Sequence, residues 1–209
     1  MKTAGMRSDQ LQNNNRLIEA ASRLLASRRE DRSVNLVDIA HEAGVSVATV
    51  YRHFNSVEAV VTAYRISIGN QLRDYSLAQN ESGSALLYKI SRHWVDIIFD
   101  RGRALVYRRS PRGFLERHQE QGEDIIGISE ALQRPLNSTI EEMGLSIPPQ
   151  IPLFLWNILF DPREIFDLKD TVGMTPDDIT DRLMTAFTGA VTSWATAPEH
   201  SVYRYPGNA

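Results

Sequence analysis

Apolar residues recur at helical spacing along most of this chain, and that period limits the fold more than any other feature. Leu17, Ile18, Ala21, Leu24 and Leu25 share one face of a helix with 3.6 residues per turn. No segment of useful length alternates apolar and polar residues, and no dipeptide signals a hairpin. The sequence therefore predicts an all-α fold with about nine helices.

Polar breaks divide the expected helices into parts. We expect a disordered arm over residues 1–13, a first domain over 14–55, a linking helix over 56–79 and a C-terminal helical domain over 80–209. Within the last part, helices are expected at 86–99, 104–109, 123–143, 153–168 and 177–197. Pro135 should kink or divide the third of these and Pro162 should interrupt the fourth, because proline lacks the amide donor that a helix needs.

Composition excludes several classes of site. The chain has 209 residues and no cysteine, so disulfides, thiolate metal sites and a cysteine nucleophile are excluded. Its five histidines show no metal-ligand spacing, and we expect neither a metal nor a cofactor. The N-terminus lacks the apolar core of a secretory signal, and no run approaches the roughly 18 apolar residues of a membrane helix. We therefore expect a cytoplasmic protein without a membrane partner.

Charge is distributed unevenly along the chain. Residues 1–79 contain ten Lys/Arg and eight Asp/Glu, a net charge of +2. Residues 80–209 have a net charge of −5, which brings the whole chain to −3. A mildly basic front and an acidic rear fit a small nucleic-acid-binding head on a body with a different role.

The segment from Asn35 to Phe54 has the pattern of two short helices joined by a tight turn. Asn35 and Ser46 are suited to cap helices over 36–43 and 47–53, and Gly44 can take the left-handed conformation that ends the first helix. The inward positions are small or apolar: Ile39, Ala40, Val45, Val50 and Phe54. This is the helix-turn-helix arrangement, which places its second helix in the major groove of DNA.

The outward side of the second helix contains small residues and hydrogen-bond donors but no acid. It consists of Val47, Ala48, Thr49, Tyr51, Arg52 and His53. Arg52 can bind guanine O6 and N7 with two hydrogen bonds, and Thr49 can meet a base edge. Tyr51, His53 and the amides at the helix start suit phosphates. Any two helices joined by a glycine turn would bury similar apolar residues, but Glu and Lys would then be mixed on the outside.

The stretch Ile39-Ala40, Ala43-Gly44-Val45-Ser46 and Val50-Tyr51-Arg52-His53-Phe54 resembles the DNA-binding domain of the TetR family of bacterial regulators. The resemblance covers about residues 14–65. It implies a homodimer held by the last two helices, a ligand pocket among the middle helices, and repression that a ligand relieves. By motif position it implies DNA contacts from Asn35, Ser46, Ala48, Thr49, Tyr51, Arg52 and His53.

The sequence departs from the family pattern at three positions. Asn35 stands where threonine is commoner, and Ala48 where glycine is common. Val57 stands where a lysine usually opens the fourth helix and pairs with phosphate. The last departure predicts somewhat weaker or less salt-sensitive DNA binding than in a member with the lysine.

The rear of the chain provides candidates for a dimer interface and for a ligand site. The strongly apolar segment 153–168 and the last helix, with small residues beside large ones, are read as a four-helix dimer interface or else as the core of one subunit. The interface candidates are Leu153, Trp156, Phe160, Leu183, Phe187, Ala190, Val191 and Trp194. The ligand-binding candidates are Tyr88, His93, Trp94, Tyr107, Phe114, His118 and Met143. Taken singly, an aromatic residue at this helical spacing is more typical of an ordinary core than of a ligand site.

Taken together, the sequence predicts a transcriptional regulator. The expected activity is repression from a near-palindromic double-stranded operator by a homodimer, relieved by a small-molecule effector that tilts the linking helix. No motif of a hydrolase elbow, a dinucleotide fold, a P-loop or a zinc protease is present, so an enzyme is not expected. The alternatives are a helical interaction or scaffold protein whose helix-turn-helix no longer binds DNA, and a transcriptional activator.

Overall fold

A computed structural model describes residues 2–27, 34–107 and 110–197, and the structural statements below concern these residues. The long helices are α1 (Lys2–Ser27), α4 (Val57–Leu77), α5 (Gly83–Arg101), α7 (Glu123–Glu142), α8 (Gln150–Leu159) and α10 (Pro176–Thr196). The short helices are α2 (Leu36–Ala43), α3 (Val47–His53), α6 (Phe114–Gln119) and α9 (Pro162–Asp167), with a 3-10 turn, η1 (Gly102–Val106), and a π turn, η2 (Leu168–Val172). No strand occurs in the described part of the chain, so the all-α prediction is confirmed.

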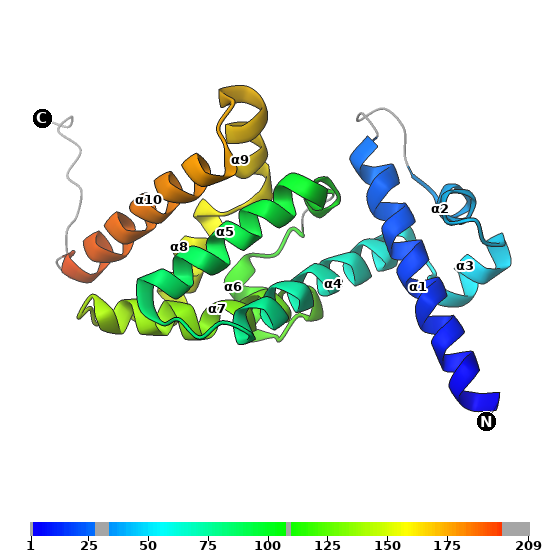
Figure 1. Cartoon of the computed structure of the whole chain (residues 1–209), viewed down its shortest axis with the longest axis horizontal. Helices are drawn as coiled ribbons and strands as arrows, with labels where there is room; N and C mark the ends of the chain where they lie inside the picture. The colour runs from blue at the N-terminus through cyan, green and yellow to red at the C-terminus, as the bar shows by residue number, and fades with distance from the viewer. Residues whose placement is uncertain (1, 28–33, 108–109, 198–209) are drawn as a thin grey trace, which may run out of the picture.

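Three helices form a small head at one end of the molecule. Helix α1 packs on α2 and α2 on α3, and α3 is at the edge farthest from α10 (Figure 1). Leu17, Ile39 and Val50 are fully buried where the three helices meet. The exposed guanidinium of Arg23 on α1 pairs with Glu42 on α2 at 2.9 Å. The head is therefore held by a local apolar core, and its outer helix is turned away from the body.

Helix α4 connects the head to the body (Figure 1). Its buried residues include Val60 and Tyr64 near the head and Ile68 and Leu72 within the body. The Tyr64 hydroxyl donates a 2.7 Å hydrogen bond to the carbonyl of Arg101 at the end of α5. One continuous apolar core thus runs from α1 through α4 into the body.

Helices α4 and α7 approach each other closely. A Cβ atom on Gly127 of α7 would lie 2.6 Å from the backbone carbon of Gly69 on α4, a distance that real Cβ atoms do not show. Only glycine lets two helical backbones come so near. The crossing at Gly69 and Gly127 therefore fixes where α4 rests on the body.

Pro135 lies inside α7 without ending it, although the sequence predicted a kink or a division there. Proline removes the amide that would bond to the carbonyl of Ala131 four residues earlier. The buried hydroxyl of Ser76 on α4 donates to that carbonyl at 2.7 Å instead. A tertiary hydrogen bond thus replaces the missing helical one.

Several expected boundaries differ from the structure. Helix α1 begins at Lys2, where a disordered arm was expected over residues 1–13, because that stretch contains no proline to stop a helix nucleated farther on. The short helix expected at 104–109 is the 3-10 turn η1, and residues 108–109 lie outside the described part of the chain. Helix α6 was not anticipated. Pro162 separates α8 from α9, as predicted.

Candidate nucleic-acid interface and inner cavity

Local hydrogen bonds fix the geometry of the helix-turn-helix. The Asn35 side chain accepts the backbone N–H groups of Val37 and Asp38, each at 2.9 Å, and Asp38 in turn accepts the Asn35 N–H at 3.2 Å. This capping box starts α2 at Leu36. Gly44 ends α2 in the left-handed conformation with φ of 66°. Both features confirm the sequence prediction.

The cap of α3 holds the second helix in register. The Ser46 Oγ accepts the Thr49 backbone N–H at 3.2 Å and lies 2.8 Å from the Thr49 hydroxyl. Val50 is fully buried, and Phe54 at the end of the helix is buried as well. With its inner side held by these two residues, α3 presents its other side to solvent.

The outer side of α3 is exposed and has no acid. Ala48 and Arg52 are exposed, and the exposed fractions of Val47 and Tyr51 are 36% and 58%. Arg52 forms neither an ion pair nor a side-chain hydrogen bond with any described residue. Its guanidinium is therefore available to an external acceptor. Seven of the eight residues that the sequence singled out for DNA binding lie on α3 or at its Ser46 cap, and the eighth, Asn35, is exposed at the start of α2.

Val57 opens α4 as an apolar residue and packs partly buried against the core. The Ser56 hydroxyl caps the helix by accepting the Ala59 N–H at 3.1 Å, which confirms the predicted cap. The position that the resemblance assigned to a phosphate-binding lysine thus contributes packing in this chain.

Within the body lies a half-open space of about 140 Å³, called the inner cavity below. It is lined from α4 to α9 by Arg65, Ile68, Trp94, Leu105, Ser110, Phe114, Arg117, Asp124, Ile125, Ile128, Trp156, Asn157, Phe160, Asp161 and Pro162. Aromatic rings with a few polar groups are typical of small-molecule sites. Arg65 and Ile68 belong to α4, so this space borders the helix that supports the head.

The polar groups of the inner cavity are mostly occupied. The indole N–H of Trp94 donates to the Phe160 carbonyl, and that of Trp156 to the Ser91 hydroxyl, both at 2.9 Å. Arg117 pairs with Asp124 at 2.7 Å, but its buried Nε has no hydrogen-bond acceptor among the described residues. Arg65 donates to the Tyr107 carbonyl at 2.7 Å.

Charge around Arg65 reflects its partial burial. Burial lowers the pKa of the Arg65 guanidinium from its ordinary value, while the carboxylate of Asp124 acts in the opposite direction. Arg117 adds a smaller lowering effect. The two guanidiniums and Asp124 form a charged group in the lining, which also includes the polar residues Ser110, Asn157 and Asp161 beside the aromatic rings.

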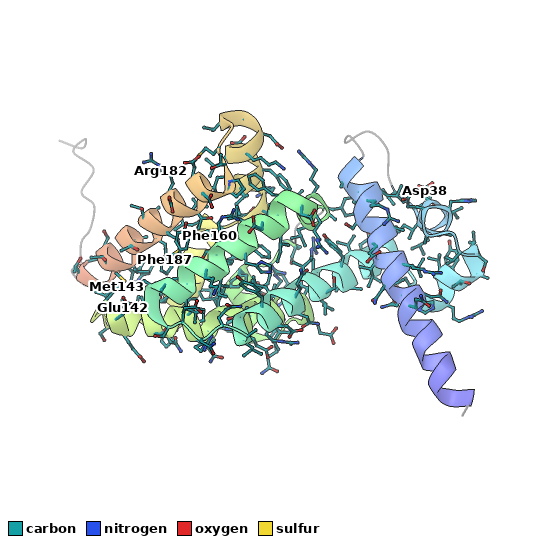
Figure 2. The ribbon with its side chains drawn as sticks, in the orientation of Figure 1. Asp38, Glu142, Met143, Phe160, Arg182 and Phe187 are labelled. Carbon is teal, nitrogen blue, oxygen red and sulfur yellow. The ribbon has the colours of Figure 1, made fainter. Side chains whose placement is uncertain are left out.

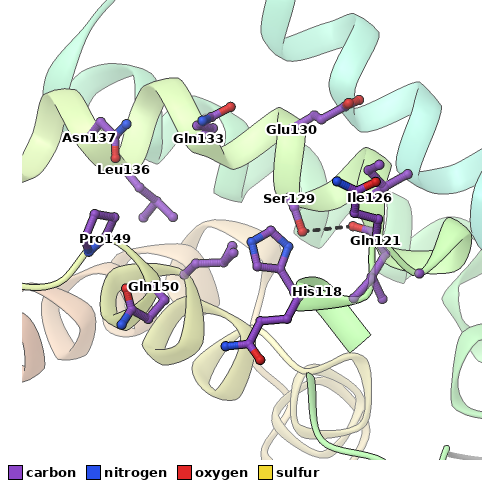
Figure 3. Close-up of a pocket in the computed structure, with 14 residues that line it drawn as sticks. His118, Gln121, Ile126, Ser129, Glu130, Gln133, Leu136, Asn137, Pro149 and Gln150 are labelled. Carbon is purple, nitrogen blue, oxygen red and sulfur yellow. Dashed lines mark hydrogen bonds between the residues drawn. The ribbon is translucent and has the colours of Figure 1, made fainter. Parts of the chain in front are cut away.

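A larger groove, called the outer groove below, lies between α6, α7 and α8 with a volume of about 440 Å³ (Figure 3). It is lined by His118, Gln119, Gln121, Gly122, Ile125, Ile126, Ser129, Glu130, Gln133, Leu136, Asn137, Pro149, Gln150 and Leu153. The His118 ring lies between α7 and α8, and the Ser129 hydroxyl near it donates to the Ile125 carbonyl at 3.1 Å (Figure 3). Sequence reasoning missed this groove because α6 has no apolar stripe to indicate a helix.

Of the seven ligand-binding candidates, three line one of these spaces. Trp94 and Phe114 line the inner cavity, and His118 lines the outer groove. Tyr88 is on the surface, where its hydroxyl bonds to Asp181 at 2.8 Å, and His93 stacks on Tyr75 with ring centres 3.8 Å apart. Tyr107 and Met143 line neither space, and Met143 lies at the far end of α7 (Figure 2).

The structure places most of the interface candidates inside one subunit. Five of these side chains are buried in the body core: Leu153, Trp156, Phe160, Phe187 and Val191. Phe160 and Phe187 are labelled in Figure 2. They face the core because α10 packs on α5 and α8, and α8 also packs on α7, so these side chains are covered within the subunit. Leu183 and Ala190 are partly exposed, and Trp194 is 47% exposed.

The chain has an all-helical body that carries a capped helix-turn-helix at the end of a long connecting helix. This is the architecture of a class of helix-turn-helix regulators. A model of the bacterial regulatory proteins of the tetR family matches residues 17–64. Over 49 residues the chain is 47% identical to an uncharacterized helix-turn-helix-type transcriptional regulator of Mycobacterium tuberculosis. The matched residues are 23% of this chain and 24% of that protein. The match thus spans about a quarter of the relative's length.

Solved structures resemble the chain over nearly its whole length. The fatty acid degradation regulator FadR from Bacillus halodurans aligns over 84% of this chain and 97% of its own, with 17% identity and a TM-score of 0.65. The regulator FadR from Bacillus subtilis, in complex with stearoyl-CoA, aligns over 82% and 96%, with 15% identity and a TM-score of 0.64. Residues 17–64 thus match the tetR family of bacterial regulatory proteins, and the solved structures show that the chain as a whole shares their fold.

Proposed function

We propose that the chain is a homodimeric transcriptional repressor that binds a near-palindromic operator through α3 and leaves it when a small molecule occupies the inner cavity. The observation that carries the proposal is the exposed, acid-free outer side of α3 with Arg52 available on it. A helix of this kind enters the major groove and reads base edges, while Ser46, Tyr51 and the helix-start amides suit phosphates.

DNA binding is tested by fluorescence anisotropy with duplexes from the region upstream of the chain's own gene. We expect saturable binding to one duplex that weakens steeply as salt is raised. Arg52→Ala should weaken this binding by about 1–3 kcal/mol, because a bidentate contact to guanine is lost. Lys89→Ala, which removes the same charge from α5 in the body, is the matched control and should change little. Equal binding of all duplexes, or none at low salt, would favour an interaction protein instead.

The proposed dimer uses the exposed side of the last helices. Ala186, Gly189 and Ser193 are exposed on one face of α10, and Trp194 and Ile158 are large apolar residues left 47% and 48% exposed. Small residues let a partner helix approach, and the large ones fill the gaps beside it. A two-fold dimer places two copies of α3 on one face of DNA, so half-sites are expected about 34–36 Å apart or at a multiple of one turn.

Gly189→Leu tests this face directly. A Cβ on Gly189 meets no atom within 4 Å in the subunit, so the larger side chain disturbs only a partner. We expect light scattering after size exclusion to show a shift from dimer to monomer. Ala85→Leu, at an exposed position of α5, is the control and should leave the mass unchanged. A dimer that persists in Gly189→Leu contradicts this interface.

The effector part of the proposal rests on the position of the inner cavity. Arg65 and Ile68 of α4 line it, so an occupant contacts the helix that supports the head. The FadR protein of similar fold was solved with stearoyl-CoA bound, which supports a ligand-binding body in this fold. The effector must bind the state that fits DNA poorly more tightly than the state that fits it well, or the equilibrium does not move. Repression and activation are distinguished by a reporter assay with the chain's own promoter.

A further inference from the structure

We propose that the inner cavity and the outer groove are two compartments of one site for an elongated, uncharged ligand with an apolar body and a hydrogen-bonding head, and that α6 is the lid between them. The proposal rests on the effector-binding function proposed above and specifies the chemistry of that effector.

The two compartments share a wall. Ile125 of α7 lines both the inner cavity and the outer groove. On α6, Phe114 lines the inner cavity and His118 lines the outer groove, and their rings are nearly parallel, with centres 6.3 Å apart. One short helix and one side chain of α7 thus stand between the two spaces.

Helix α6 has the properties of a segment that moves at low cost. None of its six residues is buried, and no side chain caps its start. Gly113 precedes it and Gly122 follows it, and between α6 and Gly122 the non-glycine residue Gln121 has a positive φ of 55°. Few buried contacts and a strained exit are typical of regions that open locally. The ion pair between Arg117 and Asp124, at 2.7 Å, is its charged attachment to α7.

Neither space alone suits a drug-sized ligand. Ligand sites usually measure about 300–1,000 Å³ and bury most of the ligand. The inner cavity, at about 140 Å³, falls short of that range and has room for little more than one ring. The outer groove, at about 440 Å³, is large enough but is bordered by exposed side chains. A molecule that extends through the α6 boundary contacts the aromatic rings of the first space and uses the volume of the second.

The inner compartment selects an apolar body with one acceptor. The indole N–H groups of Trp94 and Trp156 already donate to protein oxygens, so these residues offer their rings rather than a hydrogen bond. The unpartnered, buried Nε of Arg117 is the exception. Because a buried donor without an acceptor costs about 1–3 kcal/mol, a ligand oxygen at the α6 boundary is favoured.

The outer compartment selects a head without charge. Its lining includes the side-chain amides of Gln119, Gln121, Gln133, Asn137 and Gln150, which both donate and accept hydrogen bonds. None of the described residues along it is a lysine or an arginine, and the carboxylate of Glu130 lies 3.3 Å from Arg73 of α4. A phosphorylated head, such as that of a coenzyme A thioester, would find no cation there. Hydroxyl or amide groups match it.

Three probes with the same ring test the proposal by isothermal titration calorimetry: phenol, phenyl β-D-glucoside and phenyl phosphate. Phenol fits the inner cavity alone, the glucoside adds an ether oxygen and an uncharged polyhydroxyl head, and the phosphate adds an anionic head. We expect the glucoside to bind about tenfold or more tightly than phenol, which is about 1.4 kcal/mol. Phenyl phosphate should bind no more tightly than phenol. A phosphate that binds best, a glucoside no better than phenol, or no binding of any probe overturns the proposal.

A pair of matched variants locates the head. Asn137 is exposed and lines the outer groove, whereas Glu141, one turn farther along α7, is exposed and does not. Asn137→Trp fills the groove and should reduce the advantage of the glucoside over phenol to about twofold or less, while Glu141→Trp should preserve it. An advantage that survives Asn137→Trp shows that the head lies elsewhere and contradicts the two-compartment site.

Association kinetics test the lid. Gly113 has φ of −63°, the value that proline imposes, so Gly113→Pro stiffens the hinge without a new backbone angle there. Gly113→Ala is a milder variant in the same direction. We expect stopped-flow fluorescence of the buried tryptophans to show slower association of the glucoside in both variants, more so in Gly113→Pro. Unchanged association rates in both variants contradict a lid role for α6.

The same preparations are assayed for binding to the operator duplex by anisotropy. A protein that binds DNA but none of the probes retains the regulator function and refutes only the ligand inference. A protein that binds the glucoside as expected but binds no duplex supports the two-compartment ligand site and refutes the proposed DNA-binding function.

Discussion

The hydrogen bond between Ser76 and the Ala131 carbonyl provides the sharpest test of how α4 is held. Both residues are buried, with exposed fractions of 2% and 1%, and the donor and acceptor are 2.7 Å apart. Pro135 provides no amide to this carbonyl, so Ser76→Ala leaves it without that donor in a place that water does not reach. A buried acceptor left unsatisfied costs about 1–3 kcal/mol of the free energy of unfolding.

The origin of that cost is isolated by a double-mutant cycle with Pro135→Ala. Alanine at 135 supplies an amide to the Ala131 carbonyl through the ordinary helical pattern. In that background Ser76→Ala should cost about 1 kcal/mol less than in the parent chain, because the carbonyl keeps a backbone donor. The cycle removes the separate effect of replacing a buried proline ring.

Urea unfolding followed by circular dichroism measures the four free energies at one protein concentration, because the proposed dimerisation would link stability to concentration. Each kcal/mol corresponds to a shift of about 2–4 °C in Tm for a chain of this size. Ser67→Ala is the control on the same helix, since its exposed hydroxyl bonds only to the Tyr64 carbonyl of α4 itself, and it should stay within about 0.5 kcal/mol. An equal cost of Ser76→Ala in both backgrounds refutes the reasoning.

Four further outcomes are expected. Val57→Lys places a cation where the resemblance puts a phosphate-binding lysine, so operator affinity should rise and the slope of log K against log salt should steepen by about 0.9 in an anisotropy titration. Gly127→Ala forces a Cβ to 2.6 Å from the Gly69 backbone and should cost about 1–3 kcal/mol or more in urea unfolding, whereas Gly189→Ala, in open space, should not destabilise. Burial lowers the pKa of His93, against a smaller raising effect of Asp96, so its contribution to stability is present above the unfolded pKa of about 6.5 and is lost as pH falls. His93→Gln should therefore flatten the decrease in the free energy of unfolding between about pH 7 and 5. In a dimer labelled at His41→Cys, the only cysteine, electron–electron double resonance should show a changed distance between heads when the glucoside binds, and an unchanged distance contradicts the tilting mechanism.

The head could be read from the sequence because its determinants are local. The caps at Asn35, Ser46 and Ser56 and the glycine at Gly44 each act within one turn of their own position, and the structure has α2 and α3 at the predicted bounds. Such contacts depend on residue type and spacing alone.

The body was less predictable because its determinants lie far apart in the chain. At Pro135 the helix continues, and the carbonyl of Ala131 that proline leaves open is satisfied by Ser76, 55 positions before Ala131. Helix α6 has charged residues and no apolar stripe, so periodicity did not indicate it. For Phe160 and Phe187, the pattern showed that they are buried but not what covers them, and the cover is the subunit itself.

The contacts of α4 indicate how an occupant of the inner cavity would reach the DNA. Beyond Gly69, the helix is held against α7 by the glycine crossing and by the Ser76 hydrogen bond. Arg65 and Ile68, which line the cavity, lie on the head side of that crossing. A ligand that displaces α4 at Arg65 and Ile68 would therefore rotate the helix about the crossing at Gly69, beyond which α4 is held against α7. The displacement would grow along the 12 residues from Ile68 back to Val57. In the proposed dimer the two heads would have to match half-sites on one face of DNA, so a small rotation at the crossing would disfavour the operator-bound state.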